Sequence, residues 1–548
     1  MKIIGFQSGH DVSYCVLEDG IPTLHNEWER FLRKKEPQGD GLKFLFDKEK
    51  DTGVLDNVDH FTHGNPRTRY GVWAHRHVPE TGEFPCFNID EDTRMRSLAP
   101  YKEYSHHLSH AANAFFSSNF EDALIITLDG GGWELARDYL AMTPDAAEDK
   151  ATAATLHIGK DNKIHSAFVS DVKDMNIGMT WAITTRDVLG LSWGFPGGNA
   201  AGTLMAMAAV GEYDPQIEAA LKNVTVDKEA VVFLAKYAMH DEKAPFNIAA
   251  TLQSITETLV KGLISGWMTQ VKKVTGYETE RLCLAGGVAL NSVFVGKIYD
   301  WFPNIKEIYV PPVPYDSGLA IGSAQYLYHH VLNYPRVKWN DNASPYLGTT
   351  YSKEEVMSAI KDHELEYQEV TDADVIELIS KDDNVISVFG GGSESGRRAL
   401  GNRSILADPR SKTMKAVINE KVKHRQSFRP FAPSILREEV SNWFVRDVDS
   451  PYMSCVIEFK EEVRDKVPAV CHIDNSARLQ TVTEKDNSWY YNFIKMFGDK
   501  TGVPILLNTS FNDREPIVET PDNAITCFQG TSIDYLYFFD YGILIKKQ

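Results

Sequence analysis

The feature that most constrains the fold is a unit of strand, glycine turn and helix that recurs in the first 330 residues. One unit begins with the apolar run 123–128 and turns at Asp-Gly-Gly-Gly. A second begins at 282–285 and turns at Gly-Gly before a helix expected from about residue 289, and a third spans 308–328. Apolar strands that alternate with helices in this way are typical of a sheet covered by helices. The sequence therefore predicts an α/β fold with a mostly parallel sheet.

The length of the chain calls for more than one hydrophobic core. At 548 residues, two or three domains are expected. Residues 333–350 are rich in Pro, Asn, Asp, Gly and Thr, so we predict a boundary there, with domains at 1–345 and 346–548. The local pattern predicts further elements in the first domain, namely a β-hairpin at 2–8 and 12–18 and helices at about 104–118 and 249–274.

Composition argues against several partners and locations. The chain has 57 Lys and Arg against 76 Asp and Glu, a net charge of −19, whereas a nucleic-acid polymer requires a basic face. Its six cysteines form no CxxC pair, which is typical of reduced thiols in a cytoplasmic protein. No segment has the length of a membrane span or the pattern of a signal peptide. We therefore predict a cytoplasmic protein that binds neither membranes nor nucleic-acid polymers.

A cationic stretch at 390–436 stands out in this acidic chain. Its basic residues are interleaved with Gly, Pro, Phe and Ala rather than set at helical spacing, and they include Arg397, Arg398, Arg403, Arg410, Lys421, Lys423, Arg425 and Arg429. Guanidinium forks match phosphate and carboxylate geometry. The stretch therefore indicates a pocket for a small anion with several phosphates, and a salt-bridged surface strip is the alternative. Arg478 could add a further fork, and Asn508 and Ser510 two neutral donors.

A histidine pair is the first candidate for metal binding. His106 and His110 are four residues apart, so on a helix they share one face and can hold one ion. Asp129, in a glycine turn after a strand, and Asp316, in Tyr-Asp-Ser-Gly, are candidate carboxylate ligands. Two imidazoles and two carboxylates suit a borderline divalent ion, Fe²⁺ or Mn²⁺ ahead of Zn²⁺, rather than Ca²⁺ or a zinc–thiolate site. The alternative is that His106 and His110 are structural or surface residues. For His107 we expect a structural role.

Glycine turns in the first domain are candidates for nucleotide binding. Backbone amides in such turns can approach a phosphate or a ribose. Each turn alone could serve only packing, but three of them beside a candidate metal cluster favour a nucleotide. The candidate glycines are Gly130, Gly131, Gly202, Gly286 and Gly287.

Six motifs then occur in a fixed order along the chain. They are HHxxHA, LDGGG, AGG-ALN, ESGRRALGNRSILADPR, KHRQSFRPFAP and LLNTSFN. In this order they resemble the O-carbamoyltransferase family, which includes nodulation carbamoyltransferases and antibiotic-tailoring enzymes such as the tobramycin carbamoyltransferase. The resemblance covers nearly the whole chain and is weakest across residues 40–100.

The resemblance implies an actin-like ATPase (Kae1-like) domain followed by a YrdC-like α/β domain that forms carbamoyl-adenylate. It implies that carbamoyl phosphate and ATP, the latter with Mg²⁺, give carbamoyl-adenylate in the second domain. The first domain, with its metal, would transfer the carbamoyl group to a hydroxyl of a small-molecule acceptor. By their match to the family motifs, the residues that would line the adenylate site are Arg398, Lys423, Arg429, Arg478 and Ser510.

Other residues take candidate roles from the same resemblance. Gly286, Gly287 and Asn291 match the nucleotide-binding turn of the family. His10 and Asp11, in the first hairpin turn, are candidates for the acceptor side and for proton removal. The sequence departs from many relatives by Thr203 in place of Lys, Gln426 in place of Glu and Arg397 in place of Pro.

Three other interpretations compete with this one. An actin-fold small-molecule kinase would need neither the histidine–aspartate cluster nor a second basic domain. A catalytically silent nucleotide sensor would have gaps in those sets. The acceptor could also be a nucleobase or a tRNA, and the acidic balance counts against the polymer but not against a free nucleotide. The acceptor is not named by the sequence, and a homo-oligomer is left open. The acceptor pocket is expected to involve the aromatic and polar residues Arg67, Arg69, Tyr70, Trp73, His75 and His77.

Overall fold

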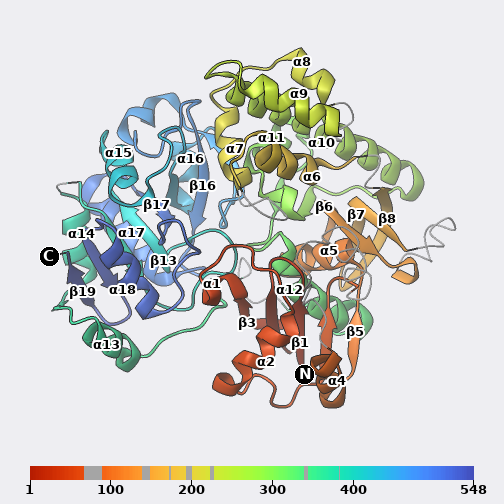
Figure 1. The fold of residues 1–548 in the computed structure, drawn as a ribbon, viewed down its shortest axis with the longest axis horizontal. Coiled ribbons are helices and arrows are strands. Elements are labelled where there is room, and N and C mark those ends of the chain that lie inside the picture. Colours follow the sequence, from red (N-terminus) through yellow and green to blue (C-terminus); the bar gives the residue numbers. More distant parts are fainter. Residues whose placement is uncertain are drawn as a thin grey trace. The chain divides into compact units, whose positions relative to one another are not determined.

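The computed structural model divides into two compact units, which are described separately here (Figure 1). Unit 1 comprises Met1–Glu29 and Glu36–Trp339, and unit 2 comprises Arg30–Lys35 and Asn340–Gln548. Unit 2 therefore includes a six-residue segment from near the N-terminus, which the sequence did not predict. The structure describes residues 1–66, 89–138, 149–171, 175–192, 200–221, 227–337, 344–381 and 383–547.

Unit 1 contains two five-stranded sheets of the same topology. The first has the order β3-β2-β1-β4-β5, and the second has the order β8-β7-β6-β9-β10. In each sheet the first two pairings are antiparallel and the last two are parallel. The strands are β1 Lys2–Gln7, β2 Ser13–Glu18, β3 Ile21–Glu27, β4 His60–His63, β5 Tyr101–Glu103, β6 Asp122–Glu134, β7 Lys150–Lys160, β8 Lys163–Asp171, β9 Arg281–Ala285 and β10 Glu307–Tyr309.

The α/β class is confirmed, but the prediction of a mostly parallel sheet was wrong. Consecutive strands joined by short turns, as at Gly9–Asp11 and Asp19–Gly20, must run antiparallel, whereas the parallel pairings need a long connection. The predicted hairpin is the start of such a three-stranded meander. The repeated sheet is the arrangement expected of an actin-like ATPase domain.

Two helices, α5 (His106–Ser117) and α12 (Leu319–Gln325), link the repeats of unit 1. α5 follows the first sheet but packs against β6 and β9 of the second, while α12 follows the second sheet and packs against β1, β2 and β4 of the first. The helices also pack on each other so closely that a Cβ at Gly322 would lie 1.9 Å from the Ser109 carbonyl oxygen. The N-terminal ends of these two helices carry the candidate site.

The remaining helices of unit 1 lie around the sheets, and α10 (Ala244–Thr275) is the longest of them. It corresponds to the helix expected at about 249–274. Among the described residues, no helix combines the length and the apolar character needed to cross a membrane. The other described helices of unit 1 are α2 Gly41–Thr52, α4 Ile89–Leu98, α6 Ile177–Ile183, α7 Ala201–Ala208, α8 Pro215–Ala220, α9 Lys228–Ala238 and α11 Ser292–Trp301, while α1 Trp28–Leu32 begins in unit 1 and continues into the segment of unit 2.

Unit 2 is built on one mixed sheet of nine strands, in the order β11-β19-β18-β12-β13-β17-β14-β16-β15. The strands are β11 Gln368–Glu369, β12 Ile386–Phe389, β13 Arg403–Ala407, β14 Ala432–Leu436, β15 Cys455–Glu458, β16 Ser476–Val482, β17 Ile505–Ser510, β18 Tyr535–Phe538 and β19 Ile543–Lys546. The helices are α13 Lys353–Asp362, α14 Asp372–Ile379, α15 Met414–Ile418, α16 Val440–Trp443, α17 Ser488–Thr501 and α18 Pro521–Gly530. The five neighbouring strands from β12 to β16 position the cationic residues.

Candidate functional site

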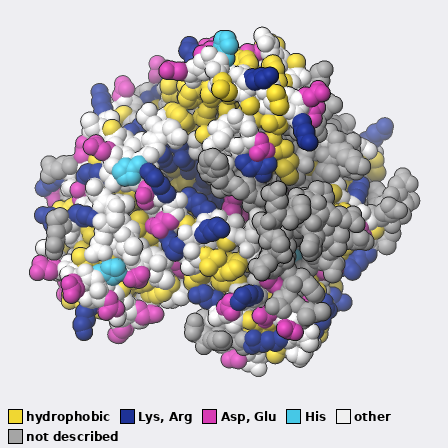
Figure 2. Space-filling model, viewed as in Figure 1, with side chains coloured by type: hydrophobic (Ala, Val, Ile, Leu, Met, Phe, Trp, Pro, Cys, Tyr) yellow, Lys and Arg dark blue, Asp and Glu magenta, His cyan; other side chains and the backbone are white. Residues whose placement is uncertain are grey.

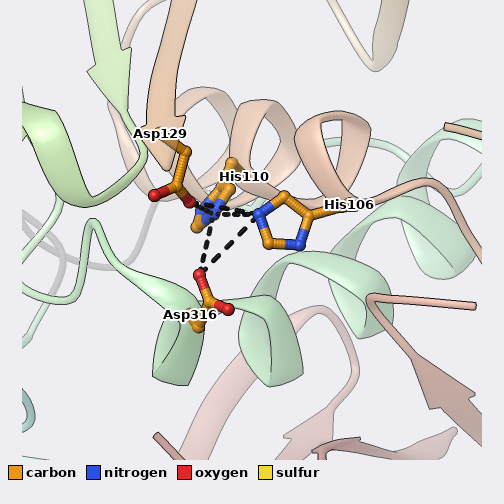
Figure 3. Close-up of side chains that lie close together, drawn as sticks. All are labelled: His106, His110, Asp129 and Asp316. Atoms are coloured by element: carbon orange, nitrogen blue, oxygen red, sulfur yellow. Dashed lines mark hydrogen bonds and ion pairs between the residues drawn. The ribbon is translucent and has the colours of Figure 1, made fainter. Parts of the chain in front are cut away.

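Four side chains of unit 1 converge on one point (Figure 3). His106 and His110 lie one turn apart at the start of α5, and their Nε2 atoms are 3.2 Å from each other. Asp129 Oδ2 lies 3.1 Å from Nε2 of His106 and 3.0 Å from that of His110. Asp316 Oδ1, from the turn before α12, lies 3.7 and 3.5 Å from the same atoms. The structure thus brings together the four predicted metal ligands.

The donor set fits a divalent metal ion. Ligand atoms about 2.0–2.2 Å from a common ion stand roughly 3.0–3.6 Å apart, which is close to the separations observed. Two imidazole nitrogens and two carboxylate oxygens are the chemistry of a borderline ion. The two Nε2 atoms face each other and the same carboxylate oxygen, an arrangement that one central cation can satisfy.

The electrostatics of the cluster also call for a positive charge. Burial alone would lower the pKa of His110, but the hydrogen bonds that it donates to Asp129 and Asp316 raise it to about 9. Burial would raise the pKa of Asp129, and the hydrogen bonds with both histidines hold it well below its ordinary value. Burial and the neighbouring His106 keep the pKa of His107 well below its ordinary value. In the absence of a metal, a proton supplies the missing charge.

The sequence folds Asp129 into this position through a bulge in β6. The strand was predicted to end at residue 128, which was wrong, because it continues to Glu134 with a shift in its pairing to β7 between Leu128 and Gly132. Bulges of this kind redirect side chains. A Cβ at Gly132 would lie 2.1 Å from ring carbons of His106, so only glycine leaves room for that imidazole.

His10 and Asp11 extend the same cluster. Nδ1 of His10 lies 3.1 Å from Asp11 Oδ2, and Nε2 lies 3.2 Å from Asp316 Oδ2. Burial would lower the pKa of His10, but Asp316 and Asp11 together raise it to about 10. Asp316 therefore faces the histidine pair with one oxygen and His10 with the other. This arrangement joins the predicted acceptor-side residues to the candidate metal centre.

The glycine turns predicted to bind a nucleotide differ in how close they lie to the candidate metal centre. The amide of Gly130 donates to Asp129 Oδ1 at 2.6 Å, and Gly131 takes a φ of 135° within the bulge. Gly286 has a φ of 87°, and a Cβ there would lie 2.1 Å from the Leu128 carbonyl oxygen. A Cβ at Gly287 would lie 3.2 Å from Asp129 Oδ1. The turns at β6 and β9 therefore adjoin the candidate metal centre.

Gly202 and Asn291 contribute less directly to these turns. Gly202 lies inside α7 with open space around it, and residues 193–199 of its turn are outside the described residues. Asn291 caps α11 by accepting from the Phe294 amide, and its Nδ2 donates to Gln253 Oε1 at 2.8 Å. The predicted acceptor residues between 67 and 77 also lie outside the described residues.

A second candidate site in unit 2 is a cluster of partly buried arginines, namely Arg398, Arg425, Arg429 and Arg478. Burial, and the neighbouring Arg398, Arg425 and Arg429, hold the pKa of Arg478 well below its ordinary value. Burial and Arg429 lower that of Arg425 to about 9. Lys and Arg are interspersed with Asp and Glu on the face in Figure 2, so the gathering of four neighbouring arginines distinguishes this cluster. The sequence placed Arg425 in the cationic stretch predicted to bind an anion, but not among the residues that match the family's adenylate site.

Neighbouring strands support the arginine cluster. Lys423 donates to the carbonyls of Ser510 and Asn512 and to Asn512 Oδ1 at 2.6–2.7 Å, which uses its three donors. Asn508 donates to the Ala399 carbonyl at 3.0 Å, next to Arg398. Ser510 Oγ donates to Asn512 Oδ1. In this geometry Lys423, Asn508 and Ser510 fix the loops that carry the arginines.

Comparison with known proteins agrees with these features. The carbamoyltransferase N-terminus model matches residues 85–325, and the carbamoyltransferase C-terminus model matches residues 377–546. Nodulation protein NolO of Bradyrhizobium diazoefficiens is 33% identical, across 81% of this chain and 79% of that protein. An uncharacterized protein of Synechocystis sp. is 34% identical, across 83% and 78%.

Among solved structures, the chain is similar to the activator of the 2-hydroxyisocaproyl-CoA dehydratase from Clostridium difficile. It covers 60% of this chain and 94% of its own at 15% identity, and its TM-score of 0.35 is too low to carry weight. The family matches are decisive without it. The chain belongs to the carbamoyltransferase family, and it is a transferase enzyme that moves a carbamoyl group.

Proposed function

We propose that the chain is an ATP-dependent O-carbamoyltransferase with a Kae1-like unit 1 and a YrdC-like unit 2. Carbamoyl phosphate and ATP give carbamoyl-adenylate in unit 2, and the carbamoyl group then passes to a hydroxyl of a small-molecule acceptor in unit 1. The observation that carries the proposal is that four partly buried guanidinium groups, those of Arg398, Arg425, Arg429 and Arg478, lie close together. Neighbouring cations repel one another and guanidinium forks match phosphate geometry, so the fitting occupant is a polyanion.

Adenylation requires charge balance and positioning more than proton transfer. Water hydrolyses carbamoyl phosphate to carbamate and inorganic phosphate, and a carbamate oxygen then attacks the α-phosphorus of ATP. The bond to pyrophosphate breaks as the new P–O bond forms. Arg398, Arg429 and Arg478 neutralise the phosphates, which is the main requirement of phosphoryl and adenylyl transfer. Mg²⁺ accompanies the ATP.

Transfer requires a polarised carbonyl and a positioned hydroxyl. The acceptor oxygen attacks the carbamoyl carbon, the C–O bond to AMP breaks, and the hydroxyl loses its proton. A divalent metal, Fe²⁺ or Mn²⁺, bound by His106, His110, Asp129 and Asp316 would supply Lewis acidity. His10 can accept the proton only when the charge of Asp316 is balanced by a cation, because Asp316 otherwise keeps His10 protonated.

The test uses the purified protein with ATP, carbamoyl phosphate, Mg²⁺ and Mn²⁺ and no acceptor. We expect pyrophosphate to form in the wild type and not in Arg398→Ala. Arg437→Ala is the matched control, because Arg437 forms a partly exposed ion pair with Asp447. ADP formation without pyrophosphate would instead establish the kinase interpretation. An absence of pyrophosphate under all conditions, including a panel of sugar, aminoglycoside and nucleoside acceptors, would reject the proposal.

A further inference from the structure

We propose that Arg30 and Arg33 are positioning residues for the anion site of unit 2, although both come from the N-terminal part of the sequence. They belong to the segment Arg30–Lys35, which is part of unit 2. The proposed consequence for catalysis rests on the proposed adenylation, whereas the structural role does not. No family motif used above includes these residues.

Arg30 holds the start of the loop that carries Arg398. Its side chain is 2% exposed, and one terminal nitrogen donates to the carbonyls of Glu394 at 3.0 Å and Gly396 at 2.6 Å. The Glu394 carboxylate then accepts from the amides at positions 400, 402 and 403, at 2.8, 2.8 and 3.1 Å. The loop is therefore fixed on both sides of Arg398, by Arg30 through the backbone and by Glu394 through its side chain.

Arg33 holds a different loop, the one that follows β17. Its two terminal nitrogens donate to the carbonyls of Pro516 and Ile517, both at 2.7 Å, and one lies 3.3 Å from the Glu515 carboxylate. The carbonyl of Glu515 accepts from Asn512 Nδ2 at 2.7 Å. Asn512 is also the partner of Lys423. Arg33 therefore supports the residues that anchor Lys423.

The guanidinium group suits this role. Its planar fork carries five donors in fixed directions, so one arginine can bridge two carbonyls, which a lysine ammonium does less well. Buried carbonyls that lose such a donor become unsatisfied, which is costly. Burial lowers the pKa of Lys423, and the positive charges of Arg425 and of Lys35, in the same segment, lower it further. Arg30 thus supports the loop that carries Arg398, and Arg33 separately supports the loop that follows β17.

The experiment measures hydrogen exchange and pyrophosphate release in the full chain. Arg30→Ala should speed amide exchange at 400–403 about 10- to 100-fold and leave 518 unchanged, whereas Arg33→Ala should do the reverse. The amide of Val518 is informative because it donates to the Phe511 carbonyl at 3.0 Å across the second loop. Arg30→Lys should restore part of the protection, and Arg437→Ala should change neither loop.

The kinetic arm asks whether the two loops serve adenylation. We expect kcat/KM for pyrophosphate release to fall about 10- to 100-fold in Arg30→Ala and Arg33→Ala, with partial recovery in Arg30→Lys and less than a twofold change in Arg437→Ala. Unchanged exchange, or equal acceleration throughout unit 2 in both variants, would overturn the positioning role. Loop-specific exchange with wild-type kcat/KM would overturn its link to catalysis. A wild type that makes no pyrophosphate would reject the proposed function, and the exchange pattern would still decide the structural role.

Discussion

The affinity of unit 1 for a divalent metal should depend steeply on pH. In the metal-free protein the carboxylates raise the pKa of His110 to about 9, so this imidazole carries a proton at neutral pH. A metal ligand must be deprotonated, and metal binding therefore releases this proton. The perturbation is simply a change of pH from 6.5 to 8.5 while Mn²⁺ binding is measured.

The magnitude follows from the distance between the pH and this pKa. At pH 7 a group with a pKa of about 9 is deprotonated in roughly one molecule in a hundred, so the apparent affinity is about 100-fold below its limit, or about 2.7 kcal/mol. The affinity should tighten about tenfold for each pH unit in this range. The same raised pKa stabilises the metal-free fold fully below the ordinary value of 6.5, by about 3 kcal/mol, and this stability is lost as the pH rises through about 9.

Free Mn²⁺ measured by electron paramagnetic resonance gives the affinity at each pH. Asp129→Asn should bind Mn²⁺ at least tenfold more weakly and with a shallower slope, because the Asp129 carboxylate helps to raise the pKa of His110. The matched control is the substitution of an exposed histidine, His240→Ala, which should behave as wild type. An affinity that is independent of pH between 6.5 and 8.5, or that weakens as the pH rises, would refute the reasoning.

Three further outcomes follow from the structure. Gly132→Ala should reduce Mn²⁺ affinity at least tenfold, since its Cβ would lie 2.1 Å from the His106 ring. The free energy of unfolding should fall by about 1–3 kcal/mol, as a thermal melt would show. Arg478→Met should abolish pyrophosphate release while the melting temperature stays the same or rises, because one of four neighbouring cations that repel one another is removed; a lower melting temperature would contradict this. Arg336→Ala should destabilise the protein by about 2–4 kcal/mol in urea, because Arg336 donates to three backbone carbonyls at the C-terminal end of α5; a loss below 1 kcal/mol would contradict that role.

Much of the candidate metal centre could be predicted because local periodicity places its residues. A spacing of four on a helix puts His106 and His110 on one face whatever the rest of the chain does. The position of Asp129 in a glycine turn after an apolar run indicated an exposed carboxylate at the end of a strand. The bulge that turns it toward the histidines could not be predicted, because it depends on the pairing of β6 with β7 and on the ring that occupies the space at Gly132.

The parts that could not be predicted depend on contacts between distant segments. Arg30 and Arg33 bind carbonyls more than 360 residues away along the chain, and no local pattern encodes such partners. Lys423 looked like a ligand for phosphate because of its charge, yet its donors are directed to backbone and amide oxygens. Charge in a sequence predicts that a site is cationic, but only the packing shows which cations remain directed at a ligand.

The proposal assigns activation to unit 2 and transfer to unit 1, and ATP–pyrophosphate exchange measures activation alone. Labelled pyrophosphate is supplied with ATP, carbamoyl phosphate and Mg²⁺, and its incorporation into ATP is followed in Arg398→Ala and His106→Ala. The proposal predicts that exchange is lost in Arg398→Ala and retained within about threefold in His106→Ala, because the latter leaves the arginine cluster intact. Loss of exchange in His106→Ala with retention in Arg398→Ala would contradict the proposed division of labour.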